Sequence, residues 1–435
     1  MKYIIYTLGC KVNQYETQAM ETMLQERGHE PAAGGESADC VIVNTCAVTA
    51  ESGRKSRQAL RRLAGENPGA VSAVCGCWSQ TDAKAAEGMA DVVWGSGDRQ
   101  GFVDAVERAV SERAKAVNID VPFARKTIED LPAGAYDGHA RAWLKIEDGC
   151  ANFCSYCIIP YARGGVRSLP PERIRAQAAE LAAKGYKEIV LTGIEVASYG
   201  RDLPGKPGLA DAIEAVADAA PQVRIRLGSI EPTVITEEWC ERMAKIPGLC
   251  PHFHLSMQSG SDGVLKRMRR KYTTEEFYAV CERLRRYFPN CALTTDLITG
   301  FPGETEEEFG ETLEFIRRCA FASMHVFPYS RRPGTVADTL PGQLTHAVKN
   351  ERAHAAHEVA AQMQREYLEQ CVGSEQAVLF ETEEDGWSFG HAPNYAEVKV
   401  EGTKLRGLVK LVKIRSISGQ MLVGAAIDSE EGKKI

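Results

Sequence analysis

Short apolar runs alternate with longer helical stretches through residues 1–329, and this alternation constrains the fold more than any other feature of the sequence. Strands and amphipathic helices in series are typical of α/β proteins, in which the strands form a parallel sheet. The chain has 435 residues, more than one hydrophobic core usually serves. At roughly 150 residues a domain, we expect about three domains.

The first series spans residues 1 to about 112 and predicts an open parallel sheet. Its strand candidates are KYIIYTL, CVIVNT, AVSAVCG and DVVWG, and helices are expected from about Asn13 to Arg27, Glu51 to Ala64, Thr81 to Gly88 and after Asp98. Cys10, Cys46 and Cys77 each follow a strand candidate by one or two residues. Because open α/β sheets collect ligands at the carboxyl ends of their strands, we expect these three cysteines to lie together.

The alternation resumes from about Trp143 to Tyr329 with six strand candidates, WLKIE, EIVLT, VRIRLG, HFHLS, CALTTDLI and SMHVF. Six βα units predict a partial (β/α)6 barrel, in which the loops after the strands carry the chemistry. The unusual residues fall in those loops, which read DGCANFCSYC, GIEVASYG, SIEP, MQSGS, TGFPGE and YSRRPGT. We therefore expect the active site at this end of the barrel.

The last region follows a polar helix expected from about Leu344 to Cys371. Four glycine-broken strand candidates, EQAVLFET, AEVKV, LRGLVKLVKIRSISG and QMLVGAAI, predict a small β-barrel of the oligonucleotide-binding kind. The fold class is therefore α/β with a C-terminal all-β module. The expected domains are residues 1–135, 136–371 and 372–435.

Composition predicts a cytoplasmic protein without a membrane partner. No apolar run approaches the roughly 18 residues that a membrane helix requires. The start, MKYIIYTLGC, contains too few apolar residues for a secretory signal. Fourteen cysteines without an export signal indicate a reducing compartment, in which thiols bind metals or carry out redox chemistry.

The segment DGCANFCSYC spaces Cys150, Cys154 and Cys157 as C-x-x-x-C-x-x-C, one thiol short of a closed site. A four-iron cube takes one thiolate per iron, so three cysteines leave one iron open. If that iron binds S-adenosylmethionine, an electron can cleave the sulfonium and release a 5′-deoxyadenosyl radical. Structural zinc on three cysteines and a histidine is the alternative, but this loop contains no histidine.

The segment DGCANFCSYCIIP resembles the radical S-adenosylmethionine enzymes, which implies a [4Fe-4S] cluster on these three cysteines. In that superfamily a Gly-Gly-Glu motif contacts the methionyl ammonium, and Gly193, Ile194 and Glu195 stand at the matching positions. The TGFPGE loop resembles the glycine-rich segment that approaches the nucleoside. The cofactor-binding residues implied by the resemblance are Thr192, Gly193, Glu195, Ser229, Gln258, Arg270, Asp296, Gly300 and Phe327.

The N-terminal blocks TLGCKVNQYET, VIVNTCAVT and VCGCWSQ are similar to those of the methylthiotransferase family. This resemblance implies a second [4Fe-4S] cluster on Cys10, Cys46 and Cys77, whose free iron holds the sulfur to be inserted. S-adenosylmethionine then serves as both methyl donor and radical source. Cys75 competes with Cys77 on spacing, and we prefer Cys77 because it lies beyond the strand candidate. The remaining seven cysteines are interpreted as packing residues.

The substrate must be argued separately, because family members act on tRNA adenosines beside the anticodon or on a ribosomal-protein aspartate. The net charge of −7 does not by itself indicate a nucleic-acid partner. However, the C-terminal module resembles the RNA-binding TRAM domain, and residues 399–415 contain six basic side chains and one acidic one. Arg54, Arg57 and Arg61 form a second basic stretch. We therefore expect tRNA as a partner, together with a low-potential electron donor; the sulfur source is left open.

Among the tRNA-modifying types, IRLGSIEP, FHLSMQSGS and VLKRMRRKYT look most like the group that thiomethylates carbon 2 of N6-threonylcarbamoyladenosine. That nucleoside carries a carboxylate, and Arg226, Arg331 and Arg332 are expected to face it from the barrel rim. The alternatives are N6-isopentenyladenosine and the ribosomal-protein aspartate as substrates. An alternative of another class is a non-catalytic iron–sulfur protein that binds RNA or carries electrons.

Overall fold

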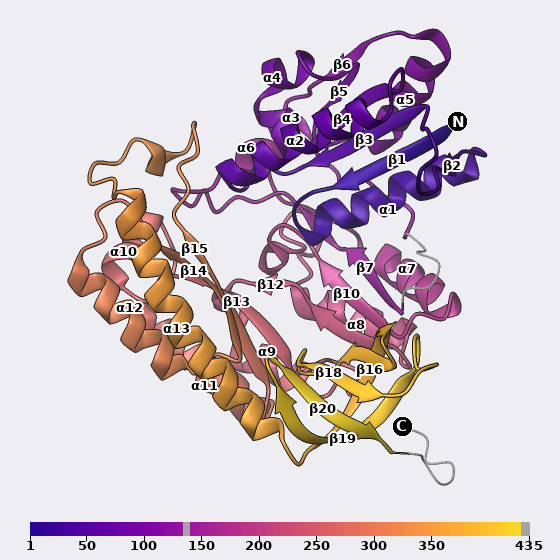
Figure 1. The fold of residues 1–435 in the computed structure, drawn as a ribbon. Helices are drawn as coiled ribbons and strands as arrows, with labels where there is room; N and C mark the ends of the chain where they lie inside the picture. Colours follow the sequence, from indigo (N-terminus) through magenta and orange to yellow (C-terminus); the bar gives the residue numbers. More distant parts are fainter. Residues whose placement is uncertain (134–139, 428–435) are drawn as a thin grey trace.

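The computed structural model describes residues 1–133 and 140–427, and its three regions follow one another in space as they do in sequence. Figure 1 shows the N-terminal sheet domain and the C-terminal β-barrel at opposite ends of the central region. Among the described residues, no helix is both long enough and apolar enough to cross a membrane. The predicted boundary between residues 135 and 136 lies outside the described residues.

The N-terminal region is a six-stranded parallel sheet in the order β2-β1-β3-β4-β5-β6, which confirms the predicted open sheet. Its strands are β1 (Lys2–Thr7), β2 (Glu30–Pro31), β3 (Cys40–Thr45), β4 (Val71–Gly76), β5 (Val92–Trp94) and β6 (Ala116–Asn118). Its helices are α1 (Lys11–Glu26), α2 (Ala50–Glu66), α3 (Cys77–Thr81), α4 (Ala83–Glu87) and α5 (Arg99–Glu112). The helix expected near Thr81 to Gly88 is instead two short helices, because the backbone leaves the helical region at Asp82.

Alternate side chains of the central strand β3 enter two separate cores, as the period of two in a strand requires. Cys40 and Ile42 pack with residues of α1 and α5 on one face of the sheet. Val41 and Val43 pack with residues of α2 and α3 on the other face. Both faces are therefore covered, which explains why this strand is apolar throughout rather than alternating.

The central region is an open arc of parallel strands, which confirms the predicted partial barrel. Its strands form two sheets, ordered β11-β10-β7 and β12-β13-β14-β15. The third predicted strand splits at Gly228, so that its first half, β11, belongs to one sheet and its continuation, β12, to the other. The strands are β7 (Arg141–Lys145), β8 (Glu147–Asp148), β9 (Arg167–Ser168), β10 (Glu188–Thr192), β11 (Arg224–Leu227), β12 (Ser229–Ile230), β13 (His252–Gln258), β14 (Ala292–Thr299) and β15 (Ser323–Pro328).

Helices cover the outer face of this arc and enclose the largest hydrophobic core. They are α6 (Ile159–Arg163), α7 (Pro171–Ala183), α8 (Leu209–Ala219), α9 (Glu237–Met243), α10 (Asp262–Met268), α11 (Thr274–Tyr287), α12 (Glu306–Cys319) and α13 (His346–Cys371). Single 3-10 turns occur at η1 (Pro122–Ala124), η2 (Val196–Ser198), η3 (Pro232–Val234) and η4 (Val336–Asp338). The helix α13 runs beside β15 and leads the chain to the last region (Figure 1).

The C-terminal region is a closed five-stranded barrel in the order β16-β17-β18-β20-β19, which confirms the predicted small β-barrel. Its strands are β16 (Glu375–Glu384), β17 (Trp387–His391), β18 (Glu397–Glu401), β19 (Val409–Ser418) and β20 (Met421–Ala426). The strand β17 has no counterpart among the predicted strands, because WSFGH contains serine, glycine and histidine and offers only a short apolar signal. The predicted boundary between residues 371 and 372 lies at the end of α13.

The C-terminal barrel contacts the central strands through arginine side chains. One buried carboxylate, Glu188, holds these arginines in place. Glu188 forms ion pairs with Arg141 at 2.7 Å, Arg224 at 2.7 Å and Arg226 at 2.8 Å. Arg224 and Arg226 also donate hydrogen bonds to barrel carbonyls, at 2.7 Å to Ala377 and at 2.9 Å to Pro393. Burial alone would raise the pKa of Glu188, but the charge of Arg226 and its two neighbours holds that pKa well below its usual range.

We predict that Glu188→Ala lowers the free energy of unfolding by about 3–5 kcal/mol, because it leaves three largely buried guanidinium groups without their counter-charge. Urea unfolding followed by circular dichroism measures the change. Glu180→Ala is the matched control, since Glu180 is exposed and its pair with Lys184 is worth at most about 0.5 kcal/mol. A loss below about 1 kcal/mol for Glu188→Ala would contradict the prediction.

Candidate functional site

Cys10, Cys46 and Cys77 lie at the carboxyl ends of three adjacent strands, β1, β3 and β4, as the sequence predicted. The strands β1 and β4 pair with β3 on either side, in parallel, so their ends share one edge of the sheet. Cys10 is the residue before α1, and Cys77 is the first residue of α3. The partial positive charge at a helix N-terminus therefore lies close to each of these two sulfurs.

Close packing holds the loops of these cysteines together. Gly9 has a φ of +107°, and a Cβ atom there would lie 2.9 Å from Cβ of Cys46, so no larger residue fits between the first two thiols. Cys75 packs in the core on the other face of the sheet, with residues of α1 and α5. Its sulfur is thus directed away from Cys77, which packs on the opposite face with residues of α2.

A buried arginine of the central region, Arg163, contacts the sulfur of Cys77. Its Nε donates a hydrogen bond to Cys77 Sγ at 3.3 Å, and its Nη2 donates to Asn13 Oδ1 at 2.7 Å and to Glu16 Oε2 at 3.1 Å. Arg163 ends α6, the short helix that directly follows the C-x-x-x-C-x-x-C loop. One side chain therefore connects the loop of one cysteine set to a thiol of the other.

Burial raises the pKa of Cys77 to about 11 and also raises the pKa of Cys10, whereas Arg163 lowers both. Bound metal would add positive charge and deprotonate the thiols, as coordinating metals do. In the described part of the chain, no group of three or more histidine, cysteine, aspartate or glutamate side chains is arranged to hold a metal ion.

The second cysteine set lies on a loop whose backbone is fixed from both sides. The N–H of Cys150 donates to the carbonyl of Gly164 at 3.0 Å, and the N–H of Ser155 donates to the carbonyl of Met268 at 3.0 Å. Gly149 has a φ of +89°, and a Cβ there would lie 2.0 Å from the carbonyl oxygen of Gly165. The three cysteines are partly exposed residues, and burial raises the pKa of Cys157 to about 12.

Arg270 is the cation beside this loop, where the sequence predicted a cofactor contact. Its Nη1 donates to Cys154 Sγ at 3.3 Å, and its Nη2 donates to the carbonyl of Ser256 at 2.8 Å. Its Nε donates to the hydroxyl of Tyr272 at 3.0 Å. Each cysteine set thus has one buried arginine that donates to one of its sulfurs, an arrangement that stabilises negative charge on sulfur.

Two carboxylates, Glu195 and Glu231, face each other next to the cysteine loop. Both accept hydrogen bonds from Nδ2 of Asn152, at 3.1 Å and 2.7 Å, and Lys271 donates to Oδ1 of Asn152 at 2.6 Å. Burial and the nearby charge of Glu231 raise the pKa of Glu195 to about 7. An ammonium group bound between the two carboxylates would offset their repulsion and favour the ionised form of Glu195.

The loop after β10, which carries Thr192, Gly193 and Glu195, packs directly on a buried carboxylate, Glu147. The N–H of Glu195 donates to Glu147 Oε2 at 2.7 Å. A Cβ at Gly193 would lie 2.7 Å from the same oxygen, so glycine is required there. Thr192 is buried at the end of β10. These three predicted residues therefore lie at the carboxyl end of the barrel strands, beside the cysteine loop.

The other predicted cofactor residues are spread over the inner surface of the arc. Gly300 has a φ of +71°, and a Cβ there would lie 2.5 Å from Cγ of Lys349 on α13. Gln258, also at positive φ, ends β13, and Phe327 is exposed near the end of β15. Ser229 and Asp296 line a cavity on the inner side of the arc.

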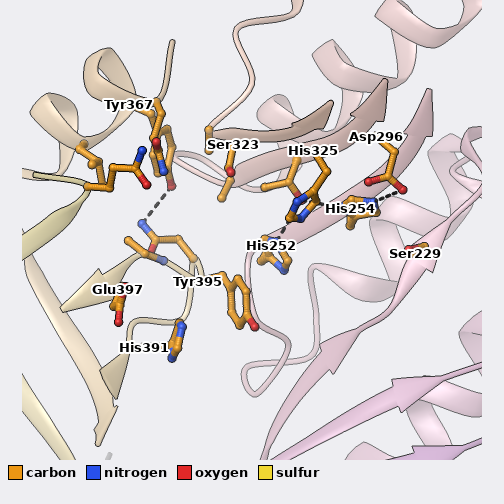
Figure 2. A pocket seen from close by; sticks show the side chains of 18 of the residues that line it. Ser229, His252, His254, Asp296, Ser323, His325, Tyr367, His391, Tyr395 and Glu397 are labelled. Atoms are coloured by element: carbon orange, nitrogen blue, oxygen red, sulfur yellow. Dashed lines mark hydrogen bonds and ion pairs between the residues drawn. The ribbon is translucent and has the colours of Figure 1, made fainter. Parts of the chain in front are cut away.

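This cavity has a volume of about 510 Å³ and lies between the central strands and the C-terminal barrel. Figure 2 shows its two walls, one formed by Ser229, His254, Asp296 and other strand residues, the second by Tyr367, His391, Tyr395 and Glu397. His254 pairs with Asp296 at 3.3 Å, and both His252 and His254 contact the hydroxyl of Thr294. Polar side chains occur on both walls, among alanine and leucine residues.

Lys11, a residue that the sequence did not single out, also lines this cavity. It follows Cys10 directly and begins α1. Burial, followed by the charges of Arg226 and Arg141, lowers the pKa of Lys11 to about 8, and Glu188 opposes this change. The cavity and the first cysteine set are therefore neighbours.

Of the three arginines expected to face a substrate carboxylate from the barrel rim, Arg226 is contradicted by the structure, and the other two stay predictions. Arg226 is fully buried against Glu188 and the C-terminal barrel. Arg331 is exposed and pairs with Asp338 at 2.9 Å. The half-buried Arg332 lies near Arg57 and Cys46. Burial lowers the pKa of Arg332, Cys46 opposes this change, and Arg57 adds to it. The sequence alone could not show that Arg226 is paired with a carboxylate of the neighbouring strand.

The basic stretch on α2, for which both phosphate contact and plain solvation were open, has two exposed arginines and one that packs on a ring. Arg54 is exposed and bonds Glu51, Arg57 lies over the ring of Trp78 at 5.7 Å, and Arg61 is exposed. Arg57 is therefore a packing residue as much as a surface charge.

Comparison with known proteins agrees with this geometry. Residues 144–316 match the radical SAM superfamily, and residues 2–95 match a family described as uncharacterized protein family UPF0004. The chain is 41% identical to the threonylcarbamoyladenosine tRNA methylthiotransferase MtaB of Bacillus subtilis, over 94% of this chain and 92% of that protein. It is 35% identical to a tRNA-2-methylthio-N(6)-dimethylallyladenosine synthase of Pelotomaculum thermopropionicum, over 88% of this chain and 87% of that protein.

Among solved structures, the fold is similar to that of the radical S-adenosylmethionine methyltransferase TsrM from Kitasatospora setae, with a TM-score of 0.57 and 15% identity. The match covers 88% of this chain and 79% of that chain. The superfamily implies S-adenosylmethionine and a [4Fe-4S] cluster as cofactors. With two three-cysteine sets, matching superfamily regions and near-full-length relatives, the chain belongs to the radical SAM methylthiotransferase family.

Proposed function

We propose that this enzyme thiomethylates carbon 2 of N6-threonylcarbamoyladenosine beside the anticodon of tRNA, using two [4Fe-4S] clusters. The observation that carries the proposal is the meeting of the two cysteine sets where α3 packs against α6. Arg163 ends the helix that follows the loop of Cys157, and its Nε donates a hydrogen bond to Cys77 Sγ, so it joins the two loops. A reactive radical and the sulfur it must meet would therefore be held close together and away from water.

The residues of both sites fit the clusters by their chemistry. Cys150, Cys154 and Cys157 would hold one cube, and the set of Cys10, Cys46 and Cys77 would hold the other, each with one iron free. When bound, these groups and S-adenosylmethionine supply a 5′-deoxyadenosyl radical and the sulfur and methyl group for insertion. The enzyme also needs a low-potential electron donor and a source of sulfur.

The side chains of the protein itself would bind and orient S-adenosylmethionine and stabilise the charge on the cysteine sulfurs. Glu195 and Glu231 lie where an ammonium group of S-adenosylmethionine would approach the open iron, and the loop of Gly193 holds Glu195 in place. Arg270 and Arg163 donate to one sulfur of each set and would keep negative charge stable there. The aromatic C–H at carbon 2 is too weakly acidic for removal by any of these carboxylates, which is why a radical is required.

Surface features of two regions support an RNA substrate. The C-terminal barrel carries the basic segment of residues 399–415 on β18, β19 and their connection. Beside the cysteine loop, the exposed rings of Phe123, Phe153 and Tyr161 lie 5.8–6.1 Å apart. Exposed aromatic rings and basic surface segments are both typical of proteins that bind unpaired RNA.

The relatives and the cavity both support N6-threonylcarbamoyladenosine as the nucleoside that is modified. The MtaB relative shows higher identity and coverage than the dimethylallyladenosine relative. The cavity is lined by a lysine, four histidines and Asp296, which suits a polar arm with a carboxylate. An isopentenyl arm would favour an apolar lining instead.

We predict that Cys154→Ala abolishes formation of 5′-deoxyadenosine, because the cube that delivers the electron loses a ligand. Cys46→Ala should retain that cleavage but stop thiomethylation, and it should bind about half the iron of the wild type. Anaerobic assays and iron analysis measure both effects. Cys75→Ala is the control that should keep both activities, and thiomethylation by Cys46→Ala would refute the division between the two sites.

We predict that tRNA from a strain lacking this enzyme loses the 2-methylthio form of N6-threonylcarbamoyladenosine and accumulates its precursor. Mass spectrometry of tRNA nucleosides measures both. The 2-methylthio form of N6-isopentenyladenosine and the ribosomal-protein aspartate serve as internal controls. If one of these lost its methylthio group instead, the corresponding alternative substrate would replace the one proposed.

A further inference from the structure

Lys11 is an ammonium group without a partner on the wall of the cavity. Within residues 1–133 and 140–427 it donates no hydrogen bond and forms no ion pair, although it lines a space of about 510 Å³. Lys11 is partly exposed, and an ammonium group that lines a cavity gains free energy from a counter-ion there. An unpaired lysine that faces a cavity therefore indicates an anion bound from outside the chain.

The charges nearest to Lys11 do not supply that counter-ion. Arg226, Arg141 and Glu188 are the charged groups that act on its ammonium. Glu188 already pairs with three arginines, and Glu381, the next carboxylate, pairs with Arg141 and His391. Both of these carboxylates are therefore already paired, and neither is free to bind the ammonium of Lys11.

Two further carboxylates line the cavity wall itself, and within the described residues neither is paired with Lys11. Asp296 pairs with His254 at 3.3 Å, on the side of the strands. Glu397 lies on β18, on the opposite wall formed by the C-terminal barrel (Figure 2). Neither carboxylate forms a pair with Lys11 in the described structure.

We propose that Lys11 binds the carboxylate of the N6-threonylcarbamoyl arm and thereby selects this nucleoside over adenosines whose N6 substituent carries no charge. The inference rests on the proposed function and names the residue that gives it its substrate specificity. His254, Asp296 and Ser229 line the same space with groups that can bond the hydroxyl and the urea of the arm.

The position of Lys11 in the chain fits this role. In adenine, N1 separates carbon 2 from carbon 6, which carries the N6 arm. A group that binds the arm must therefore lie close to the atom that delivers sulfur to carbon 2. Lys11 directly follows Cys10, a proposed ligand of the sulfur-donating cluster, and its side chain extends into the cavity. Lys11 would thus hold the N6 arm while carbon 2 of the same adenine lies near the cluster that donates sulfur.

The test uses the anaerobically reconstituted enzyme and anticodon stem-loop RNAs that differ only in the N6 arm. One RNA carries the threonylcarbamoyl arm, the second carries the same arm with its carboxylate converted to a carboxamide, and the third carries unmodified adenosine. Lys11→Gln should raise the Kd of the first RNA about 10- to 100-fold, as expected for the loss of a hydrogen bond between charged groups. It should leave the Kd of the other two RNAs within about twofold.

The decisive comparison is a double-mutant cycle, in which the Lys11→Gln change in the protein is combined with the carboxamide change in the RNA. If Lys11 and the carboxylate bind each other, converting the carboxylate to carboxamide should weaken binding to the wild type but not to Lys11→Gln. Lys11→Arg should retain most of the discrimination, and Lys115→Gln, a change of an exposed lysine in the same domain, should change nothing. Iron content and circular dichroism of each variant report whether the cluster beside Cys10 and the fold are intact.

The outcomes separate this inference from the proposed function. A wild type that prefers the threonylcarbamoyl RNA while Lys11→Gln keeps the same preference would overturn the role of Lys11 and leave the function standing. Equal binding of the carboxylate and carboxamide RNAs by the wild type would also overturn it, since the anion bound by Lys11 would then be another group, such as a phosphate. A wild type that does not thiomethylate the first RNA would instead refute the proposed function.

Discussion

A fully buried network of charges around Glu16 joins the N-terminal domain to the central region, and the rest of the site depends on it. Glu16 lies on α1 and contacts Lys145 of β7 at 2.9 Å and Arg163 of α6 at 3.1 Å. Arg99 approaches the same carboxylate at 3.4 Å. Burial alone would raise the pKa of Glu16, but Arg163, Lys145 and Arg99 hold it at about 2. The carboxylate therefore stays ionised, and removing it would leave three buried cations.

The same network determines where the two cysteine sets lie relative to each other. Arg163 uses one nitrogen for Cys77 and the others for Asn13 and Glu16, so the orientation of α6 is fixed by groups of the N-terminal domain. The loop of Cys157 directly precedes α6 and follows that orientation. An ordinary apolar interface would permit small rotations between domains, whereas paired buried charges have few alternative arrangements. A fixed separation suits a reaction in which a radical and a sulfur donor must meet.

Much of this arrangement was predictable from the sequence, because parallel strands and their carboxyl ends follow from local patterns. The pattern of VIVNTCAVT places Cys46 at a strand end whatever the tertiary contacts are. What the sequence did not predict are the side chains that act across domains. Arg163 reads as an ordinary basic residue at the end of a short helix, and Lys11 as a solvated residue at the start of another. Their roles depend on which carboxylates are already paired, which only the packed structure shows.

The prediction for Arg226 was wrong for the same reason. The contacts that Arg226 makes instead explain how the cavity is closed on the side of the C-terminal barrel. A buried arginine on a barrel strand reads as a substrate contact only if no protein carboxylate lies closer, and Glu188 lies on the neighbouring strand. Arg226 instead supports the ring of Tyr395 at 4.7 Å, and that ring stacks between His252 and His391. The C-terminal barrel thus closes the cavity with its own residues, so the module proposed to bind RNA also forms part of the pocket proposed to receive the modified base.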